Sequence, residues 1–204
     1  VVNGTAALHL ALQAIGLNSG DEVLVQSLTY VASIQAITST NAKPVFCDIN
    51  PETLTIDLAD AEKRISSKTK AIMPVHYAGG VGNLEEIYSF AKKHNLRVIE
   101  DSAHAFGTIH SNKLVGSFGD ISCFSFDGIK NITSGEGGCL VTNDKEIIRK
   151  AKIFRSLGVI NEANLRYKRK RRWNYNVKEQ GWRYHMSDLN AAIGLTQLKR
   201  FSKL

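Results

Sequence analysis

Short apolar runs rich in β-branched residues alternate with amphipathic stretches of about a dozen residues along most of this chain. The apolar runs predict strands at 21–27, 43–49, 70–77, 97–102, 120–126 and 137–143. The amphipathic stretches predict helices at 5–17, 30–41, 58–66, 83–95, 144–158 and 186–201. Asp57 and Ser187 are placed to cap two of these helices. Such alternation favours a mostly parallel sheet with helices on both faces.

The chain is long enough for one large domain. Its 204 residues, 43% of them hydrophobic, allow a substantial core. We therefore expect one α/β domain over residues 1–204, with three α/β/α layers. Ligands of such sheets bind beyond the carboxyl ends of the strands, so residues that follow predicted strands are the first candidates for a site.

The cysteines and the lengths of the apolar runs indicate the cellular compartment in which the protein works. Cys47, Cys123 and Cys139 are far apart, each within a strand-like run, which is typical of buried free thiols and not of a disulfide or zinc set. No apolar run approaches the roughly 20 residues that span a membrane, and no signal peptide is visible. We expect a cytoplasmic protein without a membrane partner.

The positive charge is concentrated in one segment. The formal net charge is +7, and residues 166–173 (RYKRKRRW) hold six basic side chains. Such a cluster suits a solvated loop, a contact to a ligand phosphate or a second subunit, or nucleic acid. No zinc finger, RNP-like aromatic motif or recognition helix accompanies it, which disfavours nucleic acid.

Several polar residues fall at predicted strand ends or helix starts. Gly4 and Thr5 begin the first helix, where free N–H groups and the helix dipole suit a phosphate, although such a start is also an ordinary cap. Glu100 and Asp101 end a strand, and only one of them can face a given side of the sheet. His104 either satisfies a local backbone group or touches a ligand.

Three more residues follow strands. Tyr30 begins a helix just beyond a strand, and by itself this is core or rim packing. Ser125 ends another strand, and Lys130 lies in the glycine- and serine-rich segment 125–138, where a lysine is usually only a solvated charge. Together, however, a lysine for a Schiff base, an acid for a ring nitrogen, a stacking aromatic ring and a helix start with hydroxyls meet the needs of pyridoxal 5'-phosphate (PLP). The sequence therefore predicts a PLP site.

A series of motifs in a fixed order carries a family resemblance. They are NGTAAL, SLTYVAS, PVHYAG, IEDSAHAFG, GDISCFSF, KNITSGEGG and MSDLNAAIGLTQL. The chain resembles the DegT/DnrJ/EryC1/StrS family of PLP-dependent sugar aminotransferases over almost all of its length. The resemblance implies the large domain of the aspartate aminotransferase fold (PLP-dependent transferase fold type I). It also implies a domain incomplete at both ends, without the family's first segment and its C-terminal small domain.

The resemblance implies roles for individual residues. Lys130 is similar to the Schiff-base lysine, which also moves the proton during transfer. Asp101 matches the partner of the pyridine nitrogen, His104 the group near the ring hydroxyl, and Tyr30 the stacking aromatic residue. The phosphate contacts match Thr5, the Ala6 backbone and Ser125.

One stretch departs from the family pattern. Where the family often reads Gly-Tyr-Asn-Tyr-Arg-Met-Ser, this chain has GWRYHMS. The family's asparagine reaches the cofactor phosphate of the partner subunit, and Arg183 stands at that position, where it can still bind a phosphate. His185 replaces the usual arginine and leaves that arginine's role open. Glu136, in the turn after the lysine, is expected to support the loop.

The resemblance implies transfer of an amino group, usually from glutamate, to a keto sugar on a nucleoside diphosphate. The NITSGEGG form favours C4 of a 4-keto-6-deoxyhexose over C3, giving an amino sugar for polysaccharide or glycan biosynthesis. A homodimer with shared active sites is expected, and residues 168–172 are candidates to hold the diphosphate in the partner subunit. A PLP-binding regulator that does not transaminate and a basic nucleic-acid-binding protein are the alternatives.

Overall fold

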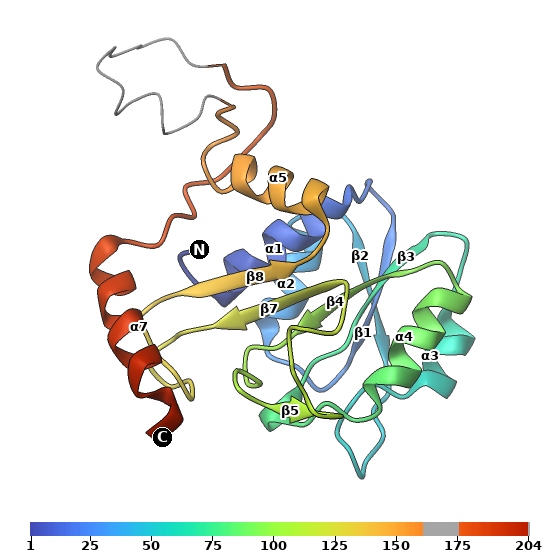
Figure 1. Cartoon of the computed structure of the whole chain (residues 1–204). Coiled ribbons are helices and arrows are strands. Elements are labelled where there is room, and N and C mark those ends of the chain that lie inside the picture. Colours follow the sequence, from blue (N-terminus) through green and yellow to red (C-terminus); the bar gives the residue numbers. More distant parts are fainter. Residues whose placement is uncertain (161–175, 204) are drawn as a thin grey trace.

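The computed structural model describes residues 1–160 and 176–203, and a six-stranded sheet lies at its centre (Figure 1). The strand order is β2-β1-β3-β4-β7-β8. In that order the strands are Lys43–Cys47, Glu22–Gln26, Thr69–Met73, Arg97–Asp101, Ile121–Ser125 and Gly138–Thr142. All neighbours pair in parallel except β8, which runs antiparallel to β7. The predicted mostly parallel sheet is confirmed.

Helices cover both faces of this sheet, as predicted. The first hydrophobic cluster joins one face to α1 (Gly4–Ile15), α2 (Val31–Thr38) and α5 (Lys145–Phe154). The second joins the other face to α3 (Leu58–Arg64) and α4 (Leu84–Lys93). The sheet and the helices packed on its two faces form the three α/β/α layers.

Successive side chains along a strand belong alternately to the two hydrophobic clusters. In β1, Val23 and Val25 belong to the cluster under α1, while Leu24 belongs to the cluster under α4. In β4, Val98 and Ile99 are divided in the same way. Side chains of a strand point to alternate faces, so a continuous apolar run is what a sheet covered on both sides requires.

Local signals set the helix ends. Asp57 and Ser187 cap α3 and α7 (Asp188–Arg200) as predicted, since each side chain accepts a backbone N–H of the first turn. Asn3 caps α1 in the same way. Gly16 ends α1 with φ +80°, a left-handed conformation that glycine adopts without a steric penalty.

A small hairpin is the element that sequence reasoning missed. It consists of β5 (Ile109–His110) and β6 (Lys113–Leu114), with two short 3-10 helices elsewhere at 77–79 and 201–203. Its two turn residues, Ser111 and Asn112, have φ values of +47° and +60°. Two-residue hairpins need positive φ, and the usual signal is a glycine after asparagine or aspartate, which this turn does not have.

The cysteines follow the prediction with one correction. Cys47 and Cys123 are buried, and all three thiols are free. Cys139 is only half-buried, because it lies on β8, the edge strand of the sheet. Among the described residues, no helix is long and apolar enough to cross a membrane. The basic segment 166–173 lies outside the described residues.

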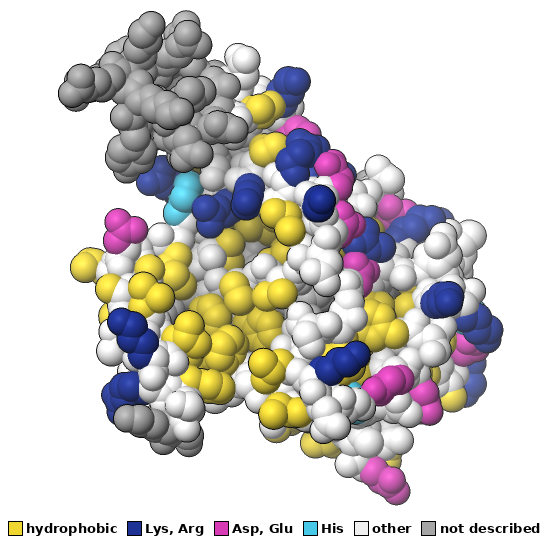
Figure 2. Space-filling model, viewed as in Figure 1, with side chains coloured by type: hydrophobic (Ala, Val, Ile, Leu, Met, Phe, Trp, Pro, Cys, Tyr) yellow, Lys and Arg dark blue, Asp and Glu magenta, His cyan; other side chains and the backbone are white. Residues whose placement is uncertain are grey.

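Helix α7 is unusual because it has no buried residue. Four of its apolar side chains are exposed: Leu189, Ile193, Leu195 and Leu198. Ile193 also helps to line a groove of about 330 Å³. Figure 2 shows hydrophobic side chains gathered in the hollow between α7 and strands β7 and β8. This apolar face has no partner within the described part of the chain.

Candidate active site

The carboxylate of Asp101 lies at the carboxyl end of β4 and is almost fully buried, at 6% exposure. Ser33 Oγ donates to its Oδ2 at 2.6 Å, and the Ala103 N–H donates to its Oδ1 at 3.2 Å. The neighbouring Glu100 contacts His76 on the other face of the sheet. The expectation that the two acids face opposite sides is confirmed.

Tyr30 is linked to this carboxylate through Ser33 in the first turn of α2. It is the N-cap residue of that helix, and its side chain is 74% exposed. Ser33 connects the two groups, because its N–H donates to the Tyr30 carbonyl at 3.1 Å while its hydroxyl donates to Asp101. The structure therefore brings an exposed aromatic ring and an anchored carboxylate to the same edge of the sheet.

His104 completes the region around the carboxylate. Its Nδ1 accepts the Ala78 N–H at 3.3 Å, so neutral His104 carries its proton on Nε2. Burial lowers the pKa of His104, and the Lys130 charge lowers it further, while the Asp101 charge acts in the opposite direction. His104 therefore lies within electrostatic reach of both groups.

Lys130 lies on the loop between β7 and β8. The loop closes at its base, where the Phe126 N–H donates to the Gly137 carbonyl at 2.7 Å. Asn131 Nδ2 donates to the Phe106 carbonyl at 2.6 Å, which ties the lysine to the segment that follows His104. No ion pair among the described residues uses the Lys130 amine.

The start of α1 packs directly against the end of β7. A Cβ on Gly4 would lie 2.8 Å from Ser125 Cβ, so only glycine allows this approach. The Ala6 N–H already donates to Asn3 Oδ1 at 2.8 Å, which leaves the amides of Gly4 and Thr5 as donors of the first turn. Thr5 is exposed, and the first turn holds no acidic residue. An anion at this helix start would meet favourable charge.

Arg183 and Glu136 are not joined to this group by any contact that the structure records. Arg183 is exposed and forms a backbone bridge with Ser156, whose hydroxyl lies 3.3 Å from His185 Nε2. Glu136 is exposed, and its carbonyl accepts the Ser134 hydroxyl at 2.9 Å. The roles expected for these residues stay predictions.

The side chains at the carboxyl edge of the sheet have the chemical groups that the predicted cofactor, PLP, requires. Two hydroxyls, of Thr5 and Ser125, and a helix start suit a phosphate. An anchored carboxylate, of Asp101, suits a protonated ring nitrogen, and the exposed ring of Tyr30 suits stacking. The amine of Lys130 suits a carbonyl group.

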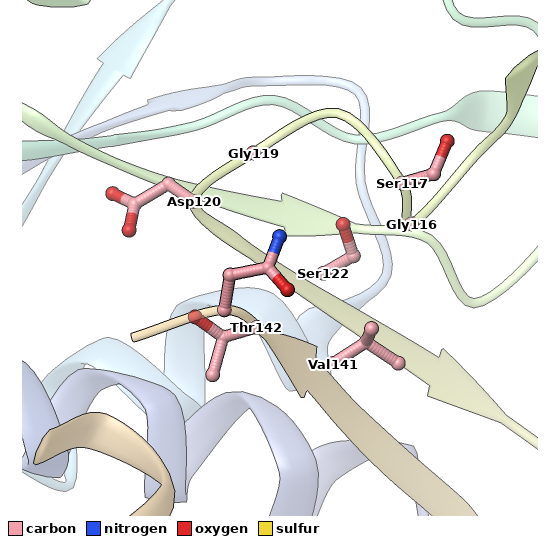
Figure 3. A pocket seen from close by; sticks show the side chains of 8 residues that line it. Gly116, Ser117, Gly119, Asp120, Ser122, Val141 and Thr142 are labelled. Atoms are coloured by element: carbon pink, nitrogen blue, oxygen red, sulfur yellow. The ribbon is translucent and has the colours of Figure 1, made fainter. Parts of the chain in front are cut away.

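A separate cavity of about 280 Å³ lies at the opposite edge of the sheet (Figure 3). It is lined by Gly116, Ser117, Gly119, Asp120, Ser122, Val141, Thr142 and Asn143. Four of its polar side chains are already engaged: Ser117 with a carbonyl, Asp120 with Arg97, Ser122 with Glu100, and Thr142 with a backbone N–H. Satisfied groups at the amino end of β7 make this cavity a weaker candidate than the carboxyl edge.

Sequence reasoning missed the residues that hold the site together. Ser33 lies one helical turn after Tyr30, so its spacing places it beside the same strand ends, but a serine within a helix gives no sign of a buried carboxylate partner. Asn131 and Asn190 hold the lysine loop through carbonyl groups. Carbonyl partners cannot be identified from side-chain types.

Comparisons with known proteins place this geometry in a family. The model of the DegT/DnrJ/EryC1/StrS aminotransferase family matches residues 1–204. A GDP-perosamine synthase of Escherichia coli O157:H7 is 48% identical over 98% of this chain and 52% of its own length. Another from Caulobacter vibrioides is 46% identical over 97% of this chain and 51% of its own length. The chain spans about half the length of the curated relatives it matches.

Solved structures agree. Helicobacter pylori PseC, an aminotransferase of pseudoaminic acid biosynthesis, matches with a TM-score of 0.90 and 35% identity over 100% of this chain and 53% of its own. The PMP form of the putative sugar aminotransferase Spr1654 from Streptococcus pneumoniae matches with a TM-score of 0.92 and 32% identity, over 100% of this chain and 56% of its own. The expected fold, that of PLP-dependent aminotransferases, is confirmed, and the chain belongs to the DegT/DnrJ/EryC1/StrS aminotransferase family.

Proposed function

We propose that residues 1–204 form the large, PLP-binding domain of a sugar aminotransferase. The enzyme moves an amino group from an amino acid, with glutamate as the first candidate, to a keto sugar carried on a nucleotide. The observation that carries this proposal is the buried Asp101 carboxylate, which Ser33 and the Ala103 N–H hold at the carboxyl end of β4. Ser33 also joins Tyr30 to the same place, because its N–H donates to the Tyr30 carbonyl. Family membership and the sugar-aminotransferase neighbours support it.

When bound, PLP supplies a carbonyl that condenses with amines and a ring that accepts electrons. Lys130 would hold the cofactor through its amine and would move the proton at the reacting carbon. Asp101, fixed by Ser33 and a backbone N–H, keeps the ring nitrogen protonated. The exposed Tyr30 ring would stack on the cofactor ring, and His104, whose Nδ1 accepts the Ala78 N–H, would have its Nε2–H free to donate to the ring hydroxyl.

The start of α1 holds the phosphate. The Thr5 and Ser125 hydroxyls and the free first-turn amides would donate to it, because the start of α1 packs against Ser125. Ala6 contributes only if its N–H turns from Asn3, to which it donates in this structure. We further propose that Arg183 serves the phosphate of a second subunit in a homodimer. The exposed apolar side chains of α7 support a protein partner for that face.

For the acceptor we propose a nucleotide-linked 4-keto-6-deoxyhexose, and a GDP-linked sugar is the first to assay. The support is the presence of three GDP-perosamine synthases among the relatives. The product would enter polysaccharide or glycan biosynthesis. The free thiols are compatible with a cytoplasmic location, which we also propose.

The test uses PLP absorbance and borohydride on the full-length protein that carries this chain. Borohydride should fix the cofactor covalently, and peptide mass spectrometry should find it on Lys130. Lys130→Ala should lose both the visible band and the covalent adduct. Lys145→Ala, at an exposed position of α5, is the matched control and should keep both. A wild-type protein without a band would refute the cofactor assignment.

A second step separates an aminotransferase from a PLP-binding regulator. Glutamate should convert the bound cofactor to its amine form in a single turnover, and the keto sugar should then reverse the change. A protein that binds PLP through Lys130 but responds to no amino donor would be a regulator of the same fold. Salt-dependent binding to nucleic acid without any cofactor band would favour the other alternative.

A further inference from the structure

A carboxylate without an assigned role lies in the interior beside Asp101. The side chain of Glu100 has 0% exposure. Tyr88 Oη at 2.6 Å and Ser122 Oγ at 3.0 Å contact one of its oxygens, and His76 Nε2 lies 2.8 Å from the other. Burial of a carboxylate is costly unless hydrogen bonds replace its water, so this position requires a physical reason.

The partners identify Glu100 as an anion. The Tyr88 hydroxyl accepts the Asp120 N–H at 3.3 Å, so its proton points to Glu100, and burial raises the pKa of Tyr88 and keeps that proton in place. His76 Nδ1 has no partner in the described part of the chain. An unpaired buried acceptor is less costly than an unpaired N–H, so neutral His76 carries its proton on Nε2 and donates it to Glu100. Three donors on two oxygens suit an ionised carboxylate.

The same contacts fix the backbone that carries Asp101. The His76 N–H donates to the Asp101 carbonyl at 3.0 Å, while its ring holds Glu100. Ser122 is the ladder partner of Glu100 on β7, and Tyr88 lies on α4. Glu100 thus ties the end of β4 to the segment after β3, to β7 and to α4.

A rotation of the β4 backbone at Glu100 would also rotate the adjacent residue, Asp101. Adjacent side chains of a strand point to opposite faces, so a turn of Glu100 about the strand axis turns Asp101 with it. We propose that Glu100 is a positioning residue that keeps the Asp101 carboxylate aimed at the ring nitrogen of PLP. This inference rests on the proposed function. The two bonds from Ser33 and Ala103 fix the Asp101 side chain, and the Glu100 contacts fix the strand below it.

The direct measurement is the protonation of the ring nitrogen. PLP labelled with ¹⁵N in the ring is bound to the full-length protein, and the ¹⁵N shift is followed with pH. Glu100→Gln keeps the shape of the side chain but cannot accept from all three donors. A less well-aimed Asp101 stabilises the protonated ring less, so the pH of proton loss should fall by about one unit, roughly tenfold in proton affinity. Glu86→Gln, an exposed acid of α4, is the matched control and should leave the titration unchanged.

Glu100→Asp separates the effect on the orientation of Asp101 from the effect of the negative charge at position 100. Aspartate keeps the negative charge but withdraws its oxygens from the three donors, so a positioning role requires the titration to fall here as well. An unchanged titration in Glu100→Gln would overturn the inference, and so would a fall in Glu100→Gln that is absent in Glu100→Asp. If neither variant folds, Tyr88→Phe decides, because it removes one bond at a half-buried position. An unchanged Tyr88→Phe titration would then overturn the inference.

The same samples distinguish this inference from the proposed function. Wild-type protein without a borohydride-fixed adduct on Lys130 overturns both. Wild-type protein with the adduct, together with a Glu100→Gln titration equal to wild type, overturns only the positioning role of Glu100. A shift in the ring titration at unchanged PLP stoichiometry supports positioning, since a purely structural role would not alter it.

Discussion

Removal of the Ser33 hydroxyl should weaken the protein by an amount that the structure allows us to work out. Ser33 Oγ donates to the buried Asp101 carboxylate at 2.6 Å, and the remaining donor, the Ala103 N–H, lies at 3.2 Å. A hydrogen bond to a charged group contributes about 1.5–3 kcal/mol. Replacing serine by alanine within a helix returns about 0.5 kcal/mol. Ser33→Ala should therefore lower the free energy of unfolding by about 1–2.5 kcal/mol.

The assay is urea unfolding of the protein without cofactor, followed by circular dichroism. With a slope of about 2 kcal/mol per molar urea, the midpoint should fall by about 0.5–1.2 M while the slope stays constant. Ser39→Ala is the matched control, because Ser39 is exposed, lies at the end of the same helix and also has a helical conformation. Its midpoint should stay close to that of wild type.

A midpoint for Ser33→Ala equal to that of Ser39→Ala would refute the reasoning. It would mean that water or a rearranged Thr29, whose hydroxyl lies 2.6 Å from Ser33 Oγ, replaces the lost donor at no cost. A changed slope would indicate instead that the unfolded or native state has altered its compactness.

Three further predictions concern other parts of the chain. Gly4→Ala should lower the free energy of unfolding by about 1–3 kcal/mol, because the new Cβ would lie 2.8 Å from Ser125 Cβ. It should also weaken PLP binding in an absorbance titration. An unchanged free energy and affinity would show that α1 can shift to make room. The hydrogen bond from His110 is the largest of the effects that lower the pKa of Glu85 to about 2. The contribution of Glu85 to stability is therefore present above the unfolded value of about 4.3 and is lost as pH falls toward 2. NMR shifts of the hairpin at 109–114 should change over this range, and Glu85→Gln should abolish the change. Burial raises the pKa of the Cys47 thiol to about 12, so iodoacetamide at pH 8 should modify it only after unfolding, as mass spectrometry can check.

The sequence predicts the ends of strands well and the contacts between them poorly. Asp101 and Ser125 end their strands as expected, because apolar runs stop where burial on both faces stops. A hydrophobic pattern records which face a residue takes but not which polar group it meets there. The bond between Ser33 and Asp101 joins residues 68 positions apart, and only the folded sheet brings them together.

Glu100 illustrates the same limit. At the end of an apolar strand it reads as a second acid beside Asp101, competing for the same role. Its three partners come from α4, β7 and the segment after β3, none of them adjacent in sequence. The turn at Ser111 and Asn112 was missed for a local reason, since neither residue is a glycine although both have positive φ.

The antiparallel pairing of β8 with β7 has a consequence for how this family can vary. Five paired positions on each side, from Ile121 with Thr142 to Ser125 with Gly138, enclose the lysine loop like a hairpin. A residue gained or lost within the loop leaves the ladder intact, whereas a residue lost within β7 moves every later side chain to the opposite face. Length changes between 121 and 125 would therefore disturb both the ladder and the site, whereas changes within the loop would spare the ladder and act only through the place of Lys130.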